Sequence, residues 1–346
     1  MKTQRLPRCL LHLSLLFVLL GPGGSDLQAA TLHVAPGGDD TAEGSLTEPL
    51  HTLPAALARV RGGGMPGTIE LAEGRYELDD LLRLGIADSG LTLSAAPGAR
   101  PVLSGGRRIT GWSRDATRPD LWRVMLPEVQ SGRWYFQQLF VEGQRMQRAR
   151  TPNTDFFRTT DRLGTNTMIE LPFKAGDIQP GWAGLPDARL VMLMKWTDLQ
   201  VPIRNVDTAR NVALLPGGPR AYWMDERNAR YWVENVPDAL DAPGEWYLDR
   251  GTGMLSFLAP AGVDPNRSIV VAPRLVTLVD VRGGSDLRKS AEGITFRGLT
   301  FAETDYAFQS DGLISPQAAV PVDAAVLVSF AGQGAFEGCT FENLGG

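Results

Sequence analysis

Short stretches in which apolar and polar residues alternate dominate the chain after residue 30. Ile69 and Leu71 are two positions apart, and Leu91 and Leu93 repeat this spacing between corners rich in Gly and Pro. A period of two is typical of β-strands with one buried face. The strands follow one another too closely for crossover helices between them, so the pattern predicts an all-β fold.

A helical period occurs near the N-terminus. Leu53, Ala56, Leu57 and Val60 fall at i, i+3, i+4 and i+7, with glycines after them as a stop signal. This spacing predicts a short amphipathic helix over 52–61. In a chain of strands, such a helix is suited to cap one end of the fold.

The aromatic composition changes sharply in the middle of the chain. All eight tryptophans lie between Trp112 and Trp246, in strand-like runs separated by Pro, Gly and Asn turns. The last run, 245–260, has the pattern of a β-hairpin around Arg250–Gly253. We therefore predict an inserted antiparallel β-sandwich-like domain over 111–267.

The chain echoes itself once. GITFRGLTFAET at 293–304 aligns with the ending QGAFEGCTFENLGG at 333–346. The alignment places Phe296 on Phe336, Gly298 on Gly338, Leu299 on Cys339 and Phe301 on Phe341. Repeats of this kind are typical of a parallel β-helix, in which equivalent residues of successive coils form interior ladders. We expect Cys339 to be a buried thiol in such a ladder and not a nucleophile.

The spacing of the echo carries two further expectations. It is about forty residues, longer than one coil needs, so a loop is expected within 304–323. Open strand edges at the ends of a β-helix are normally covered. The helix at 52–61 can cover the first end, and no comparable segment follows Phe341. We therefore expect β-helix coils over 31–110 and 268–346, with further coils missing from this chain.

The first thirty residues have the three parts of a secretory signal. Lys2, Arg5 and Arg8 precede an apolar run at 10–20, and small residues lead to cleavage near Ala29/Ala30. The run is too short to span a bilayer, and no later stretch is long enough. Residues 1–30 therefore predict a secreted or periplasmic protein without a membrane span.

Charge and cysteine content limit the function classes. The formal net charge is -5. Residues 1–30 sum to +2 (Lys2, Arg5, Arg8 and Asp26), so the remainder carries about -7. The sequence has no basic stripe of the kind that binds nucleic acid. After signal removal Cys339 is the remaining cysteine, so no intramolecular disulfide forms. The sequence does not determine the oligomeric state, and we expect a monomer.

Several motifs resemble a known family. LHVAPGGDD, GTIELAEGRYEL and APGARPVLSGG look like the first coils of right-handed β-helix proteins of the pectate-lyase-like superfamily. QQLFVEGQRMQRARTPN, EWYLDRGTGMLSF and the CTFENLGG ending resemble glycoside hydrolase family 141. The resemblance covers nearly all of 31–346. It implies a β-helix with an inserted domain and hydrolysis of plant-type polysaccharides, with fucosidase and xylanase activities among those attributed to the family.

Glycoside hydrolysis requires two carboxyl groups that flank the scissile bond. Asp305 and Asp311 in the expected loop are the candidates, although charges of this kind are more often solvated side chains of a loop or strand face. The resemblance implies that the catalytic acids lie on later coils, so no position here inherits that role. A polysaccharide lyase and a non-catalytic glycan-binding scaffold remain the alternatives.

Aromatic and basic residues provide candidates for substrate binding. Trp196 could stack on a sugar ring, and Arg148 and Arg150 could bind an acidic sugar, although core packing and ion pairing are the alternatives. With His12, His33 and His51 as the whole histidine inventory, a zinc site or a catalytic triad is not expected. We predict no cofactor, and calcium, which takes only oxygen ligands, stays open.

Overall fold

The computed structural model describes residues 31–63, 67–165, 168–185, 187–195, 197–217, 227–285, 289–308, 310–314 and 322–346. The predicted signal segment, Trp196 and part of the predicted loop at 304–323 lie outside these ranges. Strands outnumber helices in the described structure, as the alternation predicted, and the sheets divide into a parallel group and a mainly antiparallel group.

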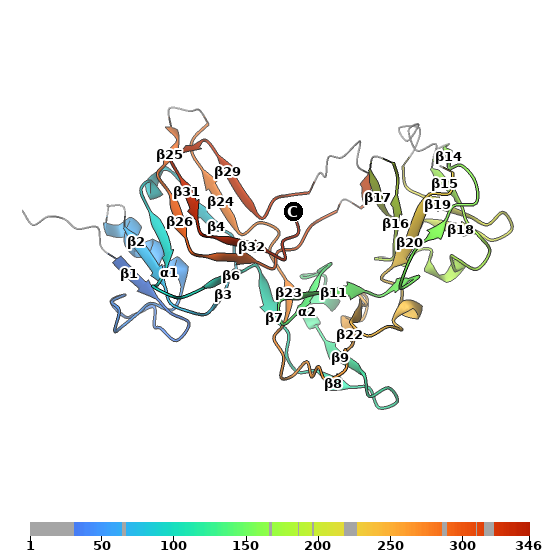
Figure 1. Ribbon diagram of the computed structural model, residues 1–346, viewed down its shortest axis with the longest axis horizontal. Helices are drawn as coiled ribbons and strands as arrows, with labels where there is room; N and C mark the ends of the chain where they lie inside the picture. The colour runs from blue at the N-terminus through green and yellow to red at the C-terminus, as the bar shows by residue number, and fades with distance from the viewer. Residues whose placement is uncertain are drawn as a thin grey trace, which may run out of the picture.

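Three parallel sheets form the first group, which Figure 1 shows on the left. The first sheet contains β1 (Thr31–Val34), β2 (Thr68–Leu71), β5 (Thr92–Ala95), β26 (Thr295–Arg297) and β31 (Ala335–Glu337). The second contains β3 (Arg75–Glu77), β6 (Val102–Ser104), β27 (Thr300–Ala302) and β32 (Thr340–Glu342). The third contains β4 (Leu82–Leu84), β24 (Val279–Arg282) and β29 (Val326–Ser329), and a small pair joins β25 (Ala291–Glu292) to β30 (Ala331–Gly332). The chain visits the three sheets in turn and then returns to the first.

The strand register confirms the echo in the sequence. Phe296 of β26 lies opposite Phe336 of β31, and Phe301 of β27 lies opposite Phe341 of β32. The paired rings stack with centroids 4.8 Å and 5.1 Å apart. Equivalent residues of the two copies therefore form ladders on the interior side of the parallel sheets.

Cys339 corrects one detail of that prediction. Its side chain is partly buried, and its Sγ lies 3.4 Å from the carbonyl oxygen of Phe296. Phe336 and Phe341 are 40% and 47% exposed. Phe336 and Phe341 lie on edge strands of their sheets, and Cys339 lies in the short connection between these strands, so the thiol is less enclosed than we expected.

The predicted helix is present as α1 (Leu53–Gly63), two residues longer at its C-terminal end than the spacing indicated. Thr52 caps it, because its hydroxyl accepts a hydrogen bond of 3.3 Å from the backbone N–H of Ala55. Leu53, Ala56 and Leu57 pack into the core of the parallel sheets. The helix therefore packs against one end of that core, as predicted.

The mainly antiparallel group begins after β6. An eight-stranded sheet contains β7 (Gly106–Arg108), β23 (Val270–Pro273), β10 (Leu139–Val141), β11 (Gln144–Arg148), β21 (Glu245–Leu248), β22 (Met254–Leu258), β9 (Leu121–Met125) and β8 (Ser113–Arg114). A six-stranded sheet contains β12 (Arg150–Thr151), β20 (Arg230–Glu234), β16 (Arg189–Leu193), β17 (Asp198–Pro202), β28 (Leu313–Ile314) and β13 (Phe157–Arg158). A four-stranded sheet contains β14 (Gly164–Thr165), β15 (Ile169–Pro172), β19 (Val212–Leu215) and β18 (Asn205–Asp207). Short helical turns occur in both groups. The turn η1 (Ile86–Asp88) lies between β4 and β5 of the parallel group, and the inserted segment contains α2 (Pro127–Gln130), η2 (Pro180–Trp182) and η4 (Pro237–Ala239).

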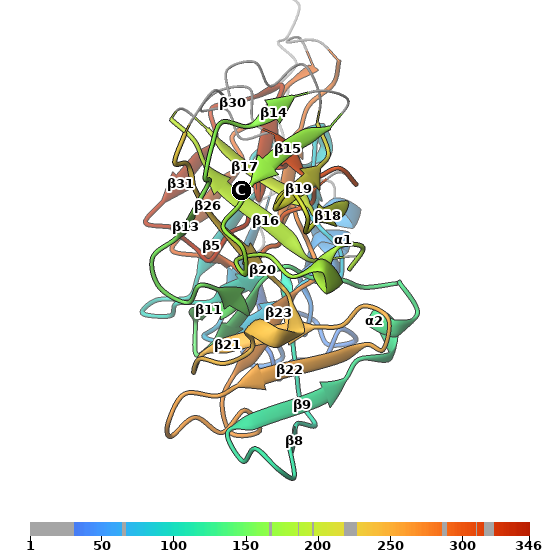
Figure 2. The same cartoon turned by 90° about the vertical axis from the view of Figure 1, so that its right-hand side faces the viewer.

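The predicted hairpin lies within the eight-stranded sheet. Trp246 pairs with Phe257 and Leu248 with Leu255 across β21 and β22, as the alternation indicated. The six- and four-stranded sheets enclose a separate core, and Figure 2 shows this part toward the viewer. Pairing of this group extends from Gly106 to Pro273, slightly beyond the segment 111–267 in which the tryptophans cluster.

The stretch after β27 leaves the parallel sheets within the segment where a loop was expected. Its β28 pairs with β17, where Ile314 lies opposite Leu199 and Leu313 opposite Gln200. β28 therefore belongs to the six-stranded sheet, although it follows β27 of the second parallel sheet along the chain. Residues 303–308 lie in the stretch of chain between β27 and β28.

Candidate functional site

One face of the six-stranded sheet concentrates arginine and aromatic side chains. Alternate residues of β20 point to opposite faces. Tyr231 and Val233 are buried in the core shared with the four-stranded sheet, whereas Arg230, Trp232 and Glu234 lie on the other face. We call this second face the outer face. In Figure 1 the four-stranded sheet lies to the right of β16, β17 and β20, and the parallel sheets lie to the left. The outer face is the side away from the four-stranded sheet, so it is turned toward the parallel sheets.

Arginines and aromatic rings alternate along the outer face. The guanidinium of Arg150 lies 4.5 Å from the centre of the Trp232 ring, and Arg230 lies 5.2 Å from that of Phe156. The two rings are 5.8 Å apart. Arg150 also donates hydrogen bonds to the carbonyls of Pro152 and Asp155, at 2.9 and 3.0 Å. These contacts hold the predicted binding residue Arg150 in an ordered cation–π row.

Arg148, the other predicted binding arginine, is buried at one end of this face. Its Nη2 donates a hydrogen bond of 3.1 Å to the Tyr135 hydroxyl, and its Nη1 lies 3.5 Å from a carboxylate oxygen of Glu234. Its Nε and Nη1 have no hydrogen-bond partner among the described residues. The side chain is 6% exposed, so it helps to join the sheets and offers little surface to a ligand.

The segment 303–308 closes the same end. Phe308 packs beneath Arg189 of β16, with the guanidinium 4.6 Å from the ring centre. Gln137 and Gln138 donate side-chain hydrogen bonds to the carbonyls of Tyr306 and Thr304, at 2.9 and 2.8 Å. These contacts connect the chain after β27 to the residues just before β10 of the eight-stranded sheet and to β16 of the six-stranded sheet.

Asp305 is a buried carboxyl in this segment. It is 6% exposed, and it accepts a hydrogen bond of 3.0 Å from the backbone N–H of Gln137. Burial raises the pKa of Asp305 to about 7, while backbone hydrogen bonds and the positive charge of Arg148 oppose the rise. The carboxyl is therefore partly protonated near neutral pH, a property shared by catalytic acids and by buried structural carboxyls.

Asp311 has a different environment. It is exposed and forms an ion pair of 2.7 Å with Arg204. Asp305, in contrast, is bonded to Gln137. The structure thus gives the two predicted carboxylates separate partners, and Trp196 lies outside the described residues.

Glu303 is a buried carboxylate whose environment the sequence did not reveal. It is 1% exposed, forms an ion pair with Arg75 and accepts a hydrogen bond of 2.5 Å from the Ser104 hydroxyl. Its φ of +62° is left-handed. These bonds join neighbouring strands of the second parallel sheet, so Glu303 is already satisfied by the protein.

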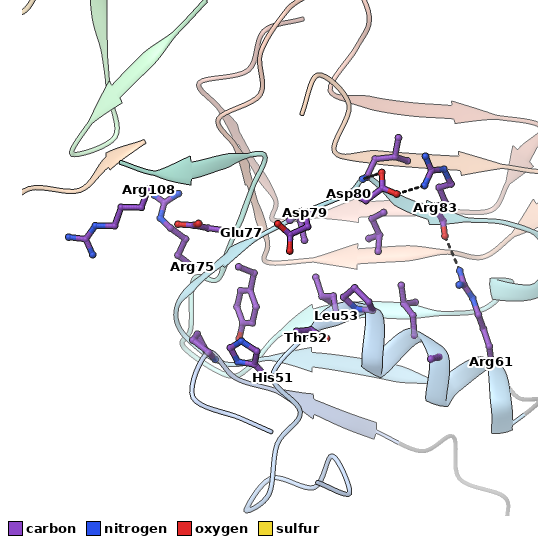
Figure 3. Close-up of a pocket in the computed structure, with 18 of the residues that line it drawn as sticks. His51, Thr52, Leu53, Arg61, Arg75, Glu77, Asp79, Asp80, Arg83 and Arg108 are labelled. Carbon is purple, nitrogen blue, oxygen red and sulfur yellow. Dashed lines mark hydrogen bonds and ion pairs between the residues drawn. The ribbon is translucent and has the colours of Figure 1, made fainter. Parts of the chain in front are cut away.

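A separate cavity of about 860 Å³ lies between α1 and the segment from β3 to β4, and Figure 3 shows its lining. Leu53 and Leu57 line it from the helix, and Glu77, Asp79 and Asp80 contribute carboxylates. A hydrogen bond from Arg83 lowers the pKa of Asp80. Asp79 is paired with Arg274 at 3.5 Å. With Asp79 exposed and Asp80 held ionised, we do not place acid catalysis here.

Several partners in the site could not be identified from the sequence. No sequence motif marks these residues, because each gains its partner only when distant segments of the folded chain come together. They are Glu234, Tyr135, Arg189 and Phe156. The clustering of tryptophans was the available sequence signal. It indicated which segment of the chain contains the site, but not which face of the sheet.

Among the described residues, no group of three or more His, Cys, Asp or Glu side chains is arranged to hold a metal ion. Among the same residues, no helix combines the length and apolar character that crossing a membrane requires.

The fold is similar to that of a solved structure titled "Glycoside hydrolase". The TM-score is 0.76 at 24% sequence identity, and the match covers 92% of this chain and 62% of that chain. This chain thus spans less than two thirds of the length of that structure. At this identity the likeness shows a shared fold.

A second structure, titled "The complex structure of XylC with xylose", matches with a TM-score of 0.35 and 16% identity, over 80% of this chain and 35% of that chain. A likeness this low carries no argument. No protein-family model matches the chain. No curated protein matches it either.

Proposed function

We propose that this chain is part of an exported carbohydrate-active enzyme, a glycoside hydrolase of the family 141 type. The observation that carries the proposal is the arrangement shared with a solved glycoside hydrolase over 92% of the chain, at a TM-score of 0.76. Fold alone does not determine chemistry. The outer face of the six-stranded sheet supports the proposal, because it combines aromatic rings with fixed arginines.

We further propose that the parallel sheets are a right-handed parallel β-helix. Three observations support it: the chain visits the three sheets in order, the strands pair in parallel, and Phe296 and Phe301 stack on their equivalents one repeat later. The inserted segment, which we assign to 111–267, interrupts the passage from β6 to β24. Export rests on the signal pattern of residues 1–30.

The outer face is the surface that we assign to carbohydrate. Sugar rings have an apolar face that packs on aromatic side chains, and their hydroxyls accept hydrogen bonds from guanidinium groups. Trp232 is partly exposed there and is flanked by Arg150 and Phe156.

We assign the catalytic carboxyl pair to coils that this chain does not contain. Asp305 is buried against Gln137, and Asp311 is paired with Arg204 on the surface. Hydrolysis requires two carboxyl groups that flank the glycosidic bond, and each of these two is already engaged by a protein partner. The role of this chain is then to bind the glycan and to support the catalytic coils.

The test compares the full-length gene product with residues 31–346 on fucoside, xyloside and pectin substrates. We expect the full-length product to release reducing sugar, and the shorter chain to bind glycan without turnover. Trp232→Ala should weaken binding about tenfold, whereas Met125→Ala, an exposed apolar change on the eight-stranded sheet, should not.

Other outcomes have defined meanings. Turnover by residues 31–346 would contradict the assignment to other coils and would direct attention to Asp305. Products that absorb in the ultraviolet would show lyase chemistry. Glycan binding without turnover by the full-length product would favour a non-catalytic scaffold, which the separate environments of Asp305 and Asp311 also suit.

A further inference from the structure

A shallow basic pocket lies at one end of the outer face. It has a volume of about 270 Å³ and is lined by Arg158, Leu193, Met194, Lys195, Asn228, Ala229 and Arg230. Three of these side chains are cationic and none is acidic. Ala229 is buried at the pocket floor, whereas the three basic side chains are exposed around it.

Strand register places two of the cations side by side. Arg158 of β13 lies directly opposite Arg230 of β20. Directly opposite side chains point to the same face of a sheet, and like charges in this position are destabilising. In the described part of the chain, no ion pair joins either arginine to a carboxylate. The nearest acidic position in this row is Asp198, two strands beyond Arg230, and it accepts a hydrogen bond of 2.7 Å from Gln200.

We propose that this pocket binds the carboxylate of an acidic sugar, a uronate unit of the glycan that the outer face contacts. A carboxylate is planar and accepts parallel hydrogen bonds from guanidinium groups. Arg230 also lies over the Phe156 ring, which continues to Trp232. A uronate bound between the arginines would therefore lie beside aromatic rings that can pack on the next sugar.

The size of the pocket favours an acidic sugar over a nucleic acid. The pocket volume of about 270 Å³ suits one small anionic group and not an extended backbone. The inference rests on the proposed function, because it names the substrate class at the same face.

The experiment uses calorimetry to measure the binding of three matched oligosaccharides to the full-length gene product. They are an oligogalacturonate, its carboxyl-reduced neutral form and a sulfated derivative of that neutral form. We expect the oligogalacturonate to bind at least tenfold more tightly than the neutral form, with an advantage that shrinks as salt increases. Arg158→Gln combined with Arg230→Gln should remove about tenfold or more of its affinity. The control is Arg210→Gln, which removes one positive charge, against two in the double variant, from an exposed arginine paired with Glu170 elsewhere on the insertion.

The outcomes separate this inference from the proposed function. Equal affinity for the acidic and neutral forms, or an equal loss in Arg210→Gln, overturns the uronate site while neutral glycan hydrolysis still supports the enzyme. Tighter binding of the sulfated sugar, or of single-stranded DNA, through the same arginines overturns the choice of a carboxylate ligand. If no glycan is bound or hydrolysed, the proposed function itself fails.

Discussion

The ring of Phe296 lies parallel to that of Phe336, with an interplanar angle of 11° and 4.8 Å between centroids. Phe296 is 1% exposed, and Phe336 is 40% exposed. The same type of side chain in the same ladder is thus enclosed in the first copy of the repeat and partly open in the second.

This difference predicts unequal effects of truncation. Phe296→Ala should cost about 3–5 kcal/mol, because it removes a buried aromatic ring and leaves a cavity. Phe336→Ala should cost about half as much, since part of its surface is already in water. Amide hydrogen exchange of β26 in the two variants measures both losses. Equal losses would show that the ladder is not packed as described.

Glycine substitution tests the corner between the first and second parallel sheets. Gly298 has a φ of +69°, and a Cβ there would lie 3.2 Å from the Cβ of Ala95. Gly298→Ala should therefore destabilise by about 1–2 kcal/mol. The matched control is Gly62→Ala in α1, where a Cβ meets no atom within 4 Å, and it should be neutral or stabilising by up to about 1 kcal/mol. Thermal unfolding of both variants checks the prediction, and a neutral Gly298→Ala would contradict it.

Buried Arg148 should be costly to remove alone. Arg148→Ala leaves Glu234 and the Tyr135 hydroxyl without their partner, and we expect a loss of about 3–5 kcal/mol. Arg148→Met combined with Glu234→Gln removes both charges and should recover most of that loss. For comparison, Arg210→Ala breaks an exposed pair with Glu170 and should cost at most about 1 kcal/mol. Denaturant unfolding followed by tryptophan fluorescence measures all three, and a double variant no better than Arg148→Ala would refute the coupling.

The raised pKa of Asp305 makes stability depend on pH. In the unfolded chain its carboxyl titrates near the ordinary value of 3.8, and in the folded protein near 7. Between these values the folded state binds more protons, so its stability falls as pH rises from about 4 to 7 and then levels off. The shift corresponds to at most about 4 kcal/mol.

Asp305→Asn tests this dependence. The amide oxygen can still accept the hydrogen bond from Gln137, but the side chain no longer ionises. The variant should therefore show a flatter pH profile and should be more stable than the wild type at pH 8. Unfolding free energies of the variant and the wild type at pH 4.5, 6 and 8 test this expectation. If both proteins show the same change of stability with pH, Asp305 is not the origin of the pH dependence.

The sequence by itself determined the local elements and their repetition. The alternation of Ile69 and Leu71 specified a strand, the helical spacing from Leu53 specified α1, and the echo specified which phenylalanines stack. These features follow from periodicity and from identical side chains in identical positions, which are properties of nearby residues.

Only the tertiary structure decided which polar groups meet. Asp305 is bonded to Gln137 across 168 positions of the chain, and Asp311 to Arg204 across 107. Such contacts depend on how separate sheets approach each other, and no local period encodes that approach. The pairing of Arg158 with Arg230 likewise depends on strand register. For this reason the local elements and the predominance of strands were predictable, whereas the meeting of these side chains was not.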